Sequence, residues 1–237
     1  YKIIFILTII ILICLNIPFL SESKINFKDK NYIAHAGGGY REIIYTNSEE
    51  SVQKSIQSGF KLIELDLLIT LDEYIVASHD WIHFKKNCEE YEEELNNEPI
   101  SLEEFNNCDY KRETLKLHQL DEKKINSLFK NNRDIMLVTD KIKNYKLLSK
   151  KFNFKERIIP ESFSLFSYLN ARLNGFENVL FPYKRYNFIY KHLFGINLIT
   201  VSYSDFVKNK KKITKLFQNG TNIFVYTSND ENFIIEN

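Results

Sequence analysis

The chain of 237 residues has little glycine, little proline, a single tryptophan and almost no net charge. Lys and Arg number 32 against 31 Asp and Glu, which gives a formal net charge of +1. Domains that bind nucleic acid through bulk charge are usually strongly basic, so no nucleic-acid partner is expected. Hydrophobic residues make up 44% of the chain, which argues against disorder and allows a packed core.

Several short motifs are also absent. No GxGxxG or Walker A sequence occurs, so a nucleotide-binding sheet has no support. The chain has three cysteines and no CxxC pattern, which argues against a zinc-finger type of site. In an exported domain Cys88 and Cys108 can form a disulfide across an acidic, loop-like stretch, a closure worth about 3 kcal/mol. Two unpaired thiols are the alternative.

Residues 3–19 form a nearly pure apolar run, broken only by Thr8 and Asn16. This run is short for a membrane-spanning helix and long for the core of a signal peptide. We therefore predict a signal peptide or a membrane anchor over residues 1–22, and a buried core helix is the alternative. Both predictions place the remainder outside the cytoplasm, as a secreted or a membrane-anchored domain.

Short β-branched or aromatic runs alternate with helical stretches beyond residue 30. The strand candidates are residues 32–35, 62–68, 75–78, 135–139, 157–159, 179–181, 199–203 and 222–227. Such alternation predicts parallel strands joined by crossover helices, and the number of repeats favours a (β/α) barrel over residues 31–237. The polar, acidic residues near 86–116 interrupt the rhythm, and we predict an insertion over one rim.

Ionisable residues lie at the predicted strand ends, where a barrel of this kind carries its chemistry. They are His35, Glu64 with Asp66, His79 with Asp80, and Asp140 with Lys141. Glu64 and Asp66 share a strand face, and burying both without a partner costs on the order of several kcal/mol. A hard cation such as Ca²⁺ or Mg²⁺ removes that cost. A solvated pair at a sheet edge is the alternative, but the neighbouring His35, His79 and Asp140 favour the cation.

His35 and His79 each follow an apolar strand. Paired histidines can serve as general acid and base near neutral pH, although a lone strand-end histidine is often structural. We predict the catalytic role for these two residues and a structural role for His83, His118 and His192.

Glycine gathers at one place, since three of the seven glycines are consecutive after His35. Such a cluster marks a special backbone site. The surrounding motifs are IAHAGG at 33–38, YTNS at 45–48, GFKLIELD at 59–66, VASHD at 76–80, ESF at 161–163 and GTNIFVYTSND at 220–230. Together they resemble the glycerophosphodiester phosphodiesterase family, with its AHRG-type first strand, PENT-type helix start, ELD strand and final HD.

The resemblance implies a TIM (β/α)8 barrel and a metal-dependent phosphodiesterase. By this resemblance Glu64, Asp66 and Asp140 bind Ca²⁺ or Mg²⁺, and His35 with His79 forms the acid–base pair. The phosphate-facing cation is then Lys141. The resemblance further suggests Asn47 and Gly37 as substrate-binding residues. We add Trp81 as a residue that lines the substrate mouth, with core packing as its alternative.

The chain departs from the family pattern at three points. Ala36 replaces the arginine of the AHRG motif, which removes an expected phosphate contact, and Thr46 replaces the PENT-type glutamate. Arg41 is one candidate substitute for the arginine, and surface solvation is its alternative role. The final strand of the family pattern is expected to be lacking after residue 230.

The expected reaction is hydrolysis of glycerophosphodiesters, or of related lipid-derived diesters, to glycerol phosphate and an alcohol. A phospholipase D-like lyase that stops at a cyclic phosphate is one alternative. A decayed barrel that acts as a membrane-tethered binding module is another. The expected partners are a small phosphodiester in lipid metabolism and a membrane contacted through the N-terminal segment, and the domain is expected to be a monomer.

Overall fold

The computed structural model describes residue 27 and residues 32–91, 95–186 and 188–226. The predicted leader over residues 1–22 lies outside the described residues, as does the region after Tyr226 to which the predicted lack of a final strand refers. No helix in the described ranges combines the length and the apolar character needed to cross a bilayer.

The described chain divides into two compact units. The N-terminal unit comprises residues 27–161 and 174–176, and the C-terminal unit comprises residues 162–173 and 177–226. The ionisable residues predicted at the strand ends, from His35 to Lys141, all belong to the N-terminal unit.

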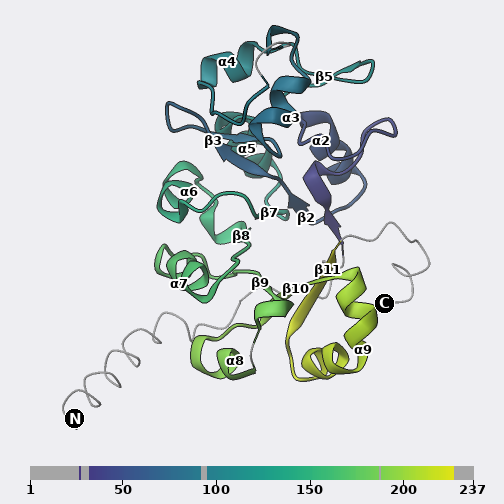
Figure 1. Cartoon of the computed structure of the whole chain (residues 1–237), viewed down its shortest axis with the longest axis vertical. Coiled ribbons are helices and arrows are strands. Elements are labelled where there is room, and N and C mark those ends of the chain that lie inside the picture. Colours follow the sequence, from purple (N-terminus) through teal and green to yellow (C-terminus); the bar gives the residue numbers. More distant parts are fainter. Residues whose placement is uncertain (1–26, 28–31, 92–94, 187, 227–237) are drawn as a thin grey trace, which may run out of the picture. The chain divides into compact units, whose positions relative to one another are not determined.

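The main sheet of the N-terminal unit is parallel (Figure 1). Its strands follow the order β1 (Ile33–Ala34), β2 (Leu62–Glu64), β7 (Met136–Thr139) and β8 (Ile158–Pro160). Ile63 pairs with Leu137, and both side chains are fully buried. A sheet that is apolar on both faces is typical of parallel strands covered by crossover helices. The predicted parallel arrangement is confirmed for these strands.

The α-helices α2 (Glu49–Gln57), α5 (Glu122–Asn131) and α6 (Tyr145–Lys151) of this unit begin at polar caps. The 3₁₀ turns η1 (His35–Gly37) and η3 (Lys155–Arg157) have no side-chain cap. Ser48 caps α2 by accepting a hydrogen bond from the backbone N–H of Ser51, and Asp121 and Asn144 cap α5 and α6 in the same way. Each cap satisfies an amide that the helix itself leaves without a partner.

The predicted strands over residues 62–68 and 75–78 differ from the structure in their pairing. The run breaks after Glu64, and β3 (Leu67–Ile69) forms an antiparallel hairpin with β4 (Ile75–Ala77). The turn between them is short, closed by a hydrogen bond from the Tyr74 N–H to Thr70 Oγ1 (2.9 Å). A parallel connection needs a crossover of a dozen or more residues, so β4 cannot join the parallel sheet through this turn.

The region predicted as an insertion contains regular structure. It follows α3 (Trp81–Lys86) and holds η2 (Glu89–Tyr91), α4 (Leu102–Asn107), β5 (Lys111–Arg112) and β6 (Leu115–Lys116). Its few apolar side chains converge on one cluster, in which Phe84 stacks on Phe105 (4.5 Å between ring centroids) and on Tyr110 (5.4 Å). A disulfide joins Cys88 to Cys108 at the edge of this cluster.

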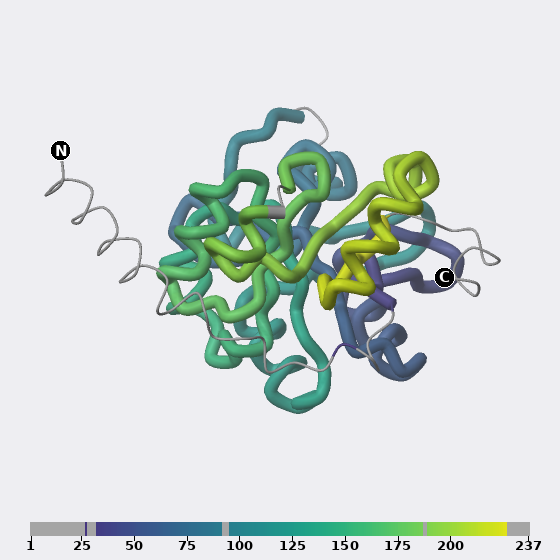
Figure 2. Tube along the Cα trace, turned by 90° about the horizontal axis from the view of Figure 1, so that it is seen from below, coloured from purple at the N-terminus to yellow at the C-terminus, as the bar shows by residue number. Residues whose placement is uncertain are grey.

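The C-terminal unit has its own parallel sheet. Its strands are β9 (Phe181–Pro182), β10 (Leu198–Ser202) and β11 (Asn222–Tyr226), with β10 in the centre. Its helices are α7 (Leu165–Leu173), η4 (Tyr183–Arg185), α8 (Phe188–Phe194) and α9 (Tyr203–Gln218). The long helix α9 connects β10 to β11 and packs beside both strands, as Figures 1 and 2 show. A helical connection of this length can join adjacent parallel strands.

Breaking the disulfide should loosen the aromatic cluster. We expect replacement of both Cys88 and Cys108 by Ser to lower the free energy of unfolding by about 3 kcal/mol, because the crosslink restricts the unfolded chain. Urea titration followed by the fluorescence of Trp81, the chain's one tryptophan, measures the change where it occurs.

The matched control is the wild-type protein in reductant, which should unfold at the same urea concentration as the double variant. An unfolding midpoint that reductant leaves unchanged would contradict a stabilising disulfide.

Candidate active site

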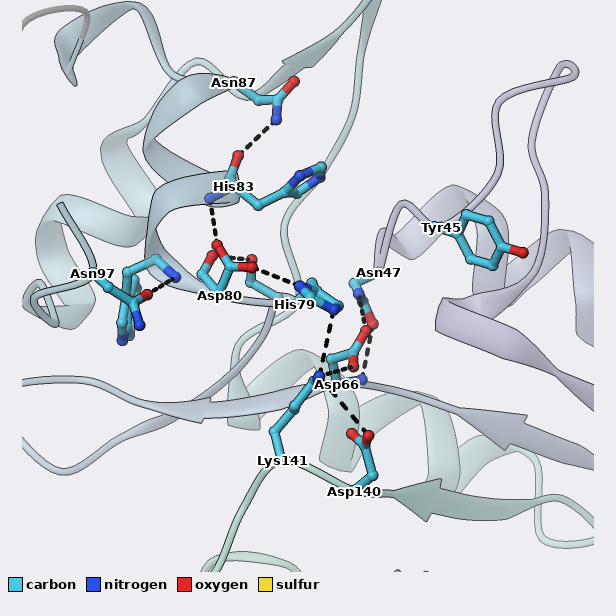
Figure 3. A network of polar contacts seen from close by, with 12 residues as sticks. Tyr45, Asn47, Asp66, His79, Asp80, His83, Asn87, Asn97, Asp140 and Lys141 are labelled. Carbon is cyan, nitrogen blue, oxygen red and sulfur yellow. Dashed lines mark hydrogen bonds and ion pairs between the residues drawn. The ribbon is translucent and has the colours of Figure 1, made fainter. Parts of the chain in front are cut away.

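Carboxylates from neighbouring strands meet at one end of the parallel sheet. Glu64 ends β2, Asp66 lies just beyond it, and Asp140 directly follows β7, the strand paired with β2. One ligand oxygen from each lies within 4.8 Å of the others. Figure 3 shows Asp66 and Asp140 approaching each other beside Lys141. The carboxyl ends of parallel strands share an edge, which brings together residues far apart in the sequence.

Two of these carboxylates are fixed by groups that follow β1. The backbone N–H of Ala36 donates to Glu64 Oε2 (2.7 Å). Asn47 makes a reciprocal pair with Asp66: its Nδ2 donates to Asp66 Oδ2 (2.9 Å), and its Oδ1 accepts from the Asp66 N–H (3.0 Å). Asn47 adopts φ +51°, a conformation that asparagine tolerates better than most residues. Because both ends of the amide are engaged, Asn47 positions Asp66, and its predicted contact with substrate stays a prediction.

The cluster is electrostatically strained without a cation. Burial, together with the negative charge of Asp66, raises the pKa of Glu64 well above its ordinary value. The same two causes raise the pKa of Asp140. Glu161, which follows β8, adds to the field that raises the pKa of Glu64. Sequence reasoning gave Glu161 no role, although its place at a strand end was a usable signal.

The donor set fits a hard divalent cation. Every ligand is a carboxylate oxygen, the type that Ca²⁺ and Mg²⁺ prefer. Within the described part of the chain, the buried Oδ1 atom of Asp140 has no hydrogen-bond partner. A buried polar atom without a partner carries a free-energy cost that a bound cation would relieve. Glu64, Asp66 and Asp140 are therefore the residues that would hold the ion.

The predicted histidines flank this cluster and remain open to solvent. The side chain of His35 is 47% exposed, and its Nε2 lies 3.8 Å from Glu64 Oε2. Burial of its remaining part lowers the pKa of His35. His79 is 56% exposed and its Nδ1 lies 2.6 Å from Asp80 Oδ2. Asp80 thereby orients the ring, so that Nε2 faces the site, where Lys141 Nζ lies 3.3 Å away.

Lys141 connects the carboxylates to His79. Its Nζ lies 3.8 Å from Asp66 Oδ1, 3.9 Å from Asp140 Oδ2 and 3.3 Å from His79 Nε2. Figure 3 shows these contacts as one continuous network. The ammonium group is thus placed where an anionic oxygen of a ligand would meet both the lysine and His79.

The position of Gly37, two residues after His35, requires glycine because of its backbone conformation and its close contact with α2. It has φ +80°, and a Cβ atom there would come within 2.6 Å of Ser51 Oγ on α2. At Gly38, which has φ +95°, a Cβ atom would lie 2.2 Å from Ser55 Oγ, and that hydroxyl donates to the Gly37 carbonyl (2.8 Å). The glycines let α2 pack against the turn that follows His35. This packing, more than a substrate contact, accounts for Gly37.

Trp81 belongs to the core. Its side chain is 4% exposed and packs edge-on against Phe84 and Phe105 in the aromatic cluster. The structure therefore favours the packing alternative over the predicted place at a substrate mouth. The physical reason is that Trp81 begins α3, whose apolar side is buried against α4.

Two residues near the histidines were missed as site candidates. His83, predicted to be structural, lies one helical turn beyond His79, and the two ring centroids are 6.4 Å apart. Tyr45 packs edge-on against His35 at 4.8 Å and adopts φ +59°. Tyr45 opens the YTNS motif, but its loop position has no periodic pattern that would indicate contact with His35.

Adding Ca²⁺ or Mg²⁺ should stabilise the protein, and Glu64→Gln should abolish that effect. At neutral pH we expect the variant without added cation to be more stable than wild type by on the order of 1 kcal/mol, because it removes a buried charge from the cluster. Thermal melts with a divalent cation and with a chelator measure both effects.

The sign of the pH dependence follows from the raised pKa of Glu64. The folded state binds the proton more tightly than the unfolded chain does, so the penalty is absent below the ordinary pKa of 4.5 and grows as the pH rises above it. Stabilisation by the cation should therefore be larger at pH 7.5 than at pH 5. If the cation stabilised Glu64→Gln as much as wild type, Glu64 would not be a ligand of the cation.

No protein-family model matches the chain, and no curated protein matches its sequence. Solved structures do match over most of its length. A glycerophosphoryl diester phosphodiesterase from Parabacteroides distasonis has a TM-score of 0.67 at 14% identity, covering 92% of this chain and 78% of that one. A glycerophosphodiester phosphodiesterase from Thermotoga maritima has a TM-score of 0.57 at 20% identity, covering 86% and 87%.

A phosphodiesterase from Oleispira antarctica, solved with the product sn-glycerol-3-phosphate, has a TM-score of 0.62 at 15% identity and covers 86% of both chains. Because these identities are low, the likeness establishes the fold alone. The chain has an α/β fold that matches the TIM barrels of glycerophosphodiester phosphodiesterases at low sequence identity.

Proposed function

We propose that this protein is a metal-dependent phosphodiesterase that hydrolyses glycerophosphodiesters, or related lipid-derived diesters, to glycerol phosphate and an alcohol. The observation that carries the proposal is the convergence of His35, His79 and Lys141 on the carboxylate cluster. The glycerophosphodiester phosphodiesterase fold supports it, as does the sn-glycerol-3-phosphate bound by the Oleispira antarctica phosphodiesterase.

The substrate phosphate binds beside the carboxylate cluster and Lys141. Glu64, Asp66 and Asp140 would hold a divalent ion, which would supply Lewis-acid stabilisation of charge on the phosphoryl oxygens. Lys141 supplies a second positive charge, beside His79. Positive charge that already lies where negative charge develops on the phosphoryl oxygens stabilises the transition state, because no group has to reorganise during the reaction.

His35 and His79 divide the proton transfers. The lowered pKa of His35 keeps it neutral near pH 7, so its imidazole accepts the proton of the attacking hydroxyl. His79 donates a proton from Nε2 to the departing alcohol oxygen, and Asp80 at Nδ1 stabilises the imidazolium before transfer. As the resemblance implies, the neighbouring glycerol hydroxyl attacks first, and water then opens the cyclic phosphate by the reverse proton transfers.

We also propose an extracytoplasmic location, either secreted or membrane-anchored. The Cys88–Cys108 disulfide supports this, because disulfides form and persist mainly in oxidising compartments.

Removing either histidine should reduce turnover strongly. We expect His35→Ala and His79→Ala each to lower kcat by about 10²- to 10⁴-fold, the usual contribution of a positioned acid or base. Release of glycerol phosphate from a panel of glycerophosphodiesters, with Ca²⁺ or Mg²⁺ present, measures the loss.

His118→Ala is the matched control, because His118 pairs with Glu50 on α2 and takes no part in the network. It should retain wild-type turnover. Wild-type protein that hydrolyses no diester with either metal would overturn the proposal and favour a decayed binding module. Phosphorus NMR that detects cyclic phosphate as the final product would replace hydrolysis by the lyase reaction.

A further inference from the structure

Arg112 reaches from the insertion to the surroundings of both histidines. It ends β5, and its Nη1 donates to the Tyr45 carbonyl (3.1 Å) and lies 3.0 Å from His83 Nε2. Tyr45 packs against His35, and His83 lies beside His79. The guanidinium of Arg112 therefore contacts one residue beside each histidine of the acid–base pair: Tyr45 beside His35, and His83 beside His79.

The charge of Arg112 is not compensated by an acidic side chain. The other basic residues of the same hairpin do have acidic partners. Lys111 pairs with Glu89 and Asp109, and Lys116 pairs with Asp109. In the described part of the chain no carboxylate forms an ion pair with Arg112, and its contacts are to a carbonyl, an imidazole and the Tyr110 hydroxyl.

The imidazole that Arg112 contacts is neutral. Burial lowers the pKa of His83, and the positive charges of Arg112 and Lys86 lower it further. His83 Nε2 then accepts a hydrogen bond from the guanidinium. The carboxylate of Asp80 lies near, but it is already engaged by the His83 N–H and by His79 Nδ1. On this side of His79, Arg112 therefore contributes a positive charge that forms no ion pair with a carboxylate among the described residues, while Asp80 keeps its negative charge beside His79.

Arg112 and Lys141 lie on different sides of His79. Lys141 contacts His79 Nε2 and the carboxylates directly, so it serves the phosphate. Arg112 stands beyond His83, on a hairpin of the insertion that follows α3. Figure 3 shows His79 between His83 and Lys141. A diester whose phosphate meets Lys141 can direct its departing alcohol past His79 towards His83 and Arg112.

We propose that Arg112 binds an anionic group on the alcohol portion of the substrate. Resting on the function proposed above, this makes the enzyme selective for glycerophosphodiesters whose headgroup carries a carboxylate or phosphate. Cationic headgroups such as choline are disfavoured by repulsion from the guanidinium. Arginine suits this role because its planar fork matches carboxylate and phosphate oxygens.

Three diesters of similar size test the proposal: the glycerophosphodiesters of 3-hydroxypropionate, propanol and choline. For wild type we expect kcat/KM to be highest for the carboxylate and lowest for choline. Arg112→Gln should lower the value for the carboxylate diester by about tenfold or more and change that for the propyl diester by less than about twofold. Arg112→Lys should keep part of the preference, because it keeps the charge.

Lys116→Gln is the matched control, since it removes one positive charge from the same hairpin while its partner Asp109 retains Lys111. It should leave the order of the three diesters unchanged. Equal losses for all three diesters in Arg112→Gln would overturn the headgroup role and assign Arg112 to the scissile phosphate. A wild-type protein without preference would overturn it as well.

Binding measurements separate this proposal from the proposed function. Calorimetry with the same three diesters and Ca²⁺, with His35→Ala introduced into every protein to prevent turnover, reports affinity alone. Tighter binding of the carboxylate diester that is lost in Arg112→Gln would support the headgroup site even in a protein that hydrolyses nothing. Equal affinities in wild type and Arg112→Gln would reject the site even in an active enzyme.

Discussion

Repulsion among Glu64, Asp66 and Asp140 is the constraint around which the N-terminal unit is arranged. These carboxylates lie within 4.8 Å of one another in a largely buried setting, which raises the pKa of Glu64 and of Asp140. A fold tolerates such a cluster only where backbone and side-chain donors hold it rigidly and a cation can neutralise it. That repulsion favours the binding of a cation, and the carboxylate oxygens suit a hard divalent one.

The elements around the cluster supply that rigidity. Neighbouring parallel strands bring Glu64 and Asp140 to the same edge, and the turn after β1 sends the Ala36 N–H to Glu64. The glycines of this turn allow α2 to approach closely, and the loop entering α2 carries Asn47, which grips Asp66 from both ends. The loss of the family arginine at Ala36 therefore leaves the support of the carboxylates intact, because the backbone amide provides it.

The insertion contributes in a different way. Its aromatic cluster and its disulfide anchor α3, which carries His83, to the hairpin that carries Arg112. The hairpin in turn holds the Tyr45 carbonyl in a loop where several residues have positive φ. Parts of the chain that are distant in sequence are thus fixed around the two histidines. A rigid rim of this kind suits discrimination between headgroups, because contacts that are already in place need little ordering on binding.

The sequence by itself determined which polar residues lie at the strand ends and that the strands of the main sheet are parallel. Periodicity and strand-end position identified His35, Glu64, Asp66, His79 and Asp140, since strand ends in such folds meet at one edge. Only the tertiary structure decided what surrounds them. The β3–β4 hairpin, the burial of Trp81 and the engagement of Asn47 with Asp66 depend on local turns and packing that periodicity does not encode. His83, Tyr45 and Arg112 entered the site for the same reason, because their proximity arises from chain segments that meet only on folding. Glu161 differs from them, since its place directly after β8 was a signal in the sequence.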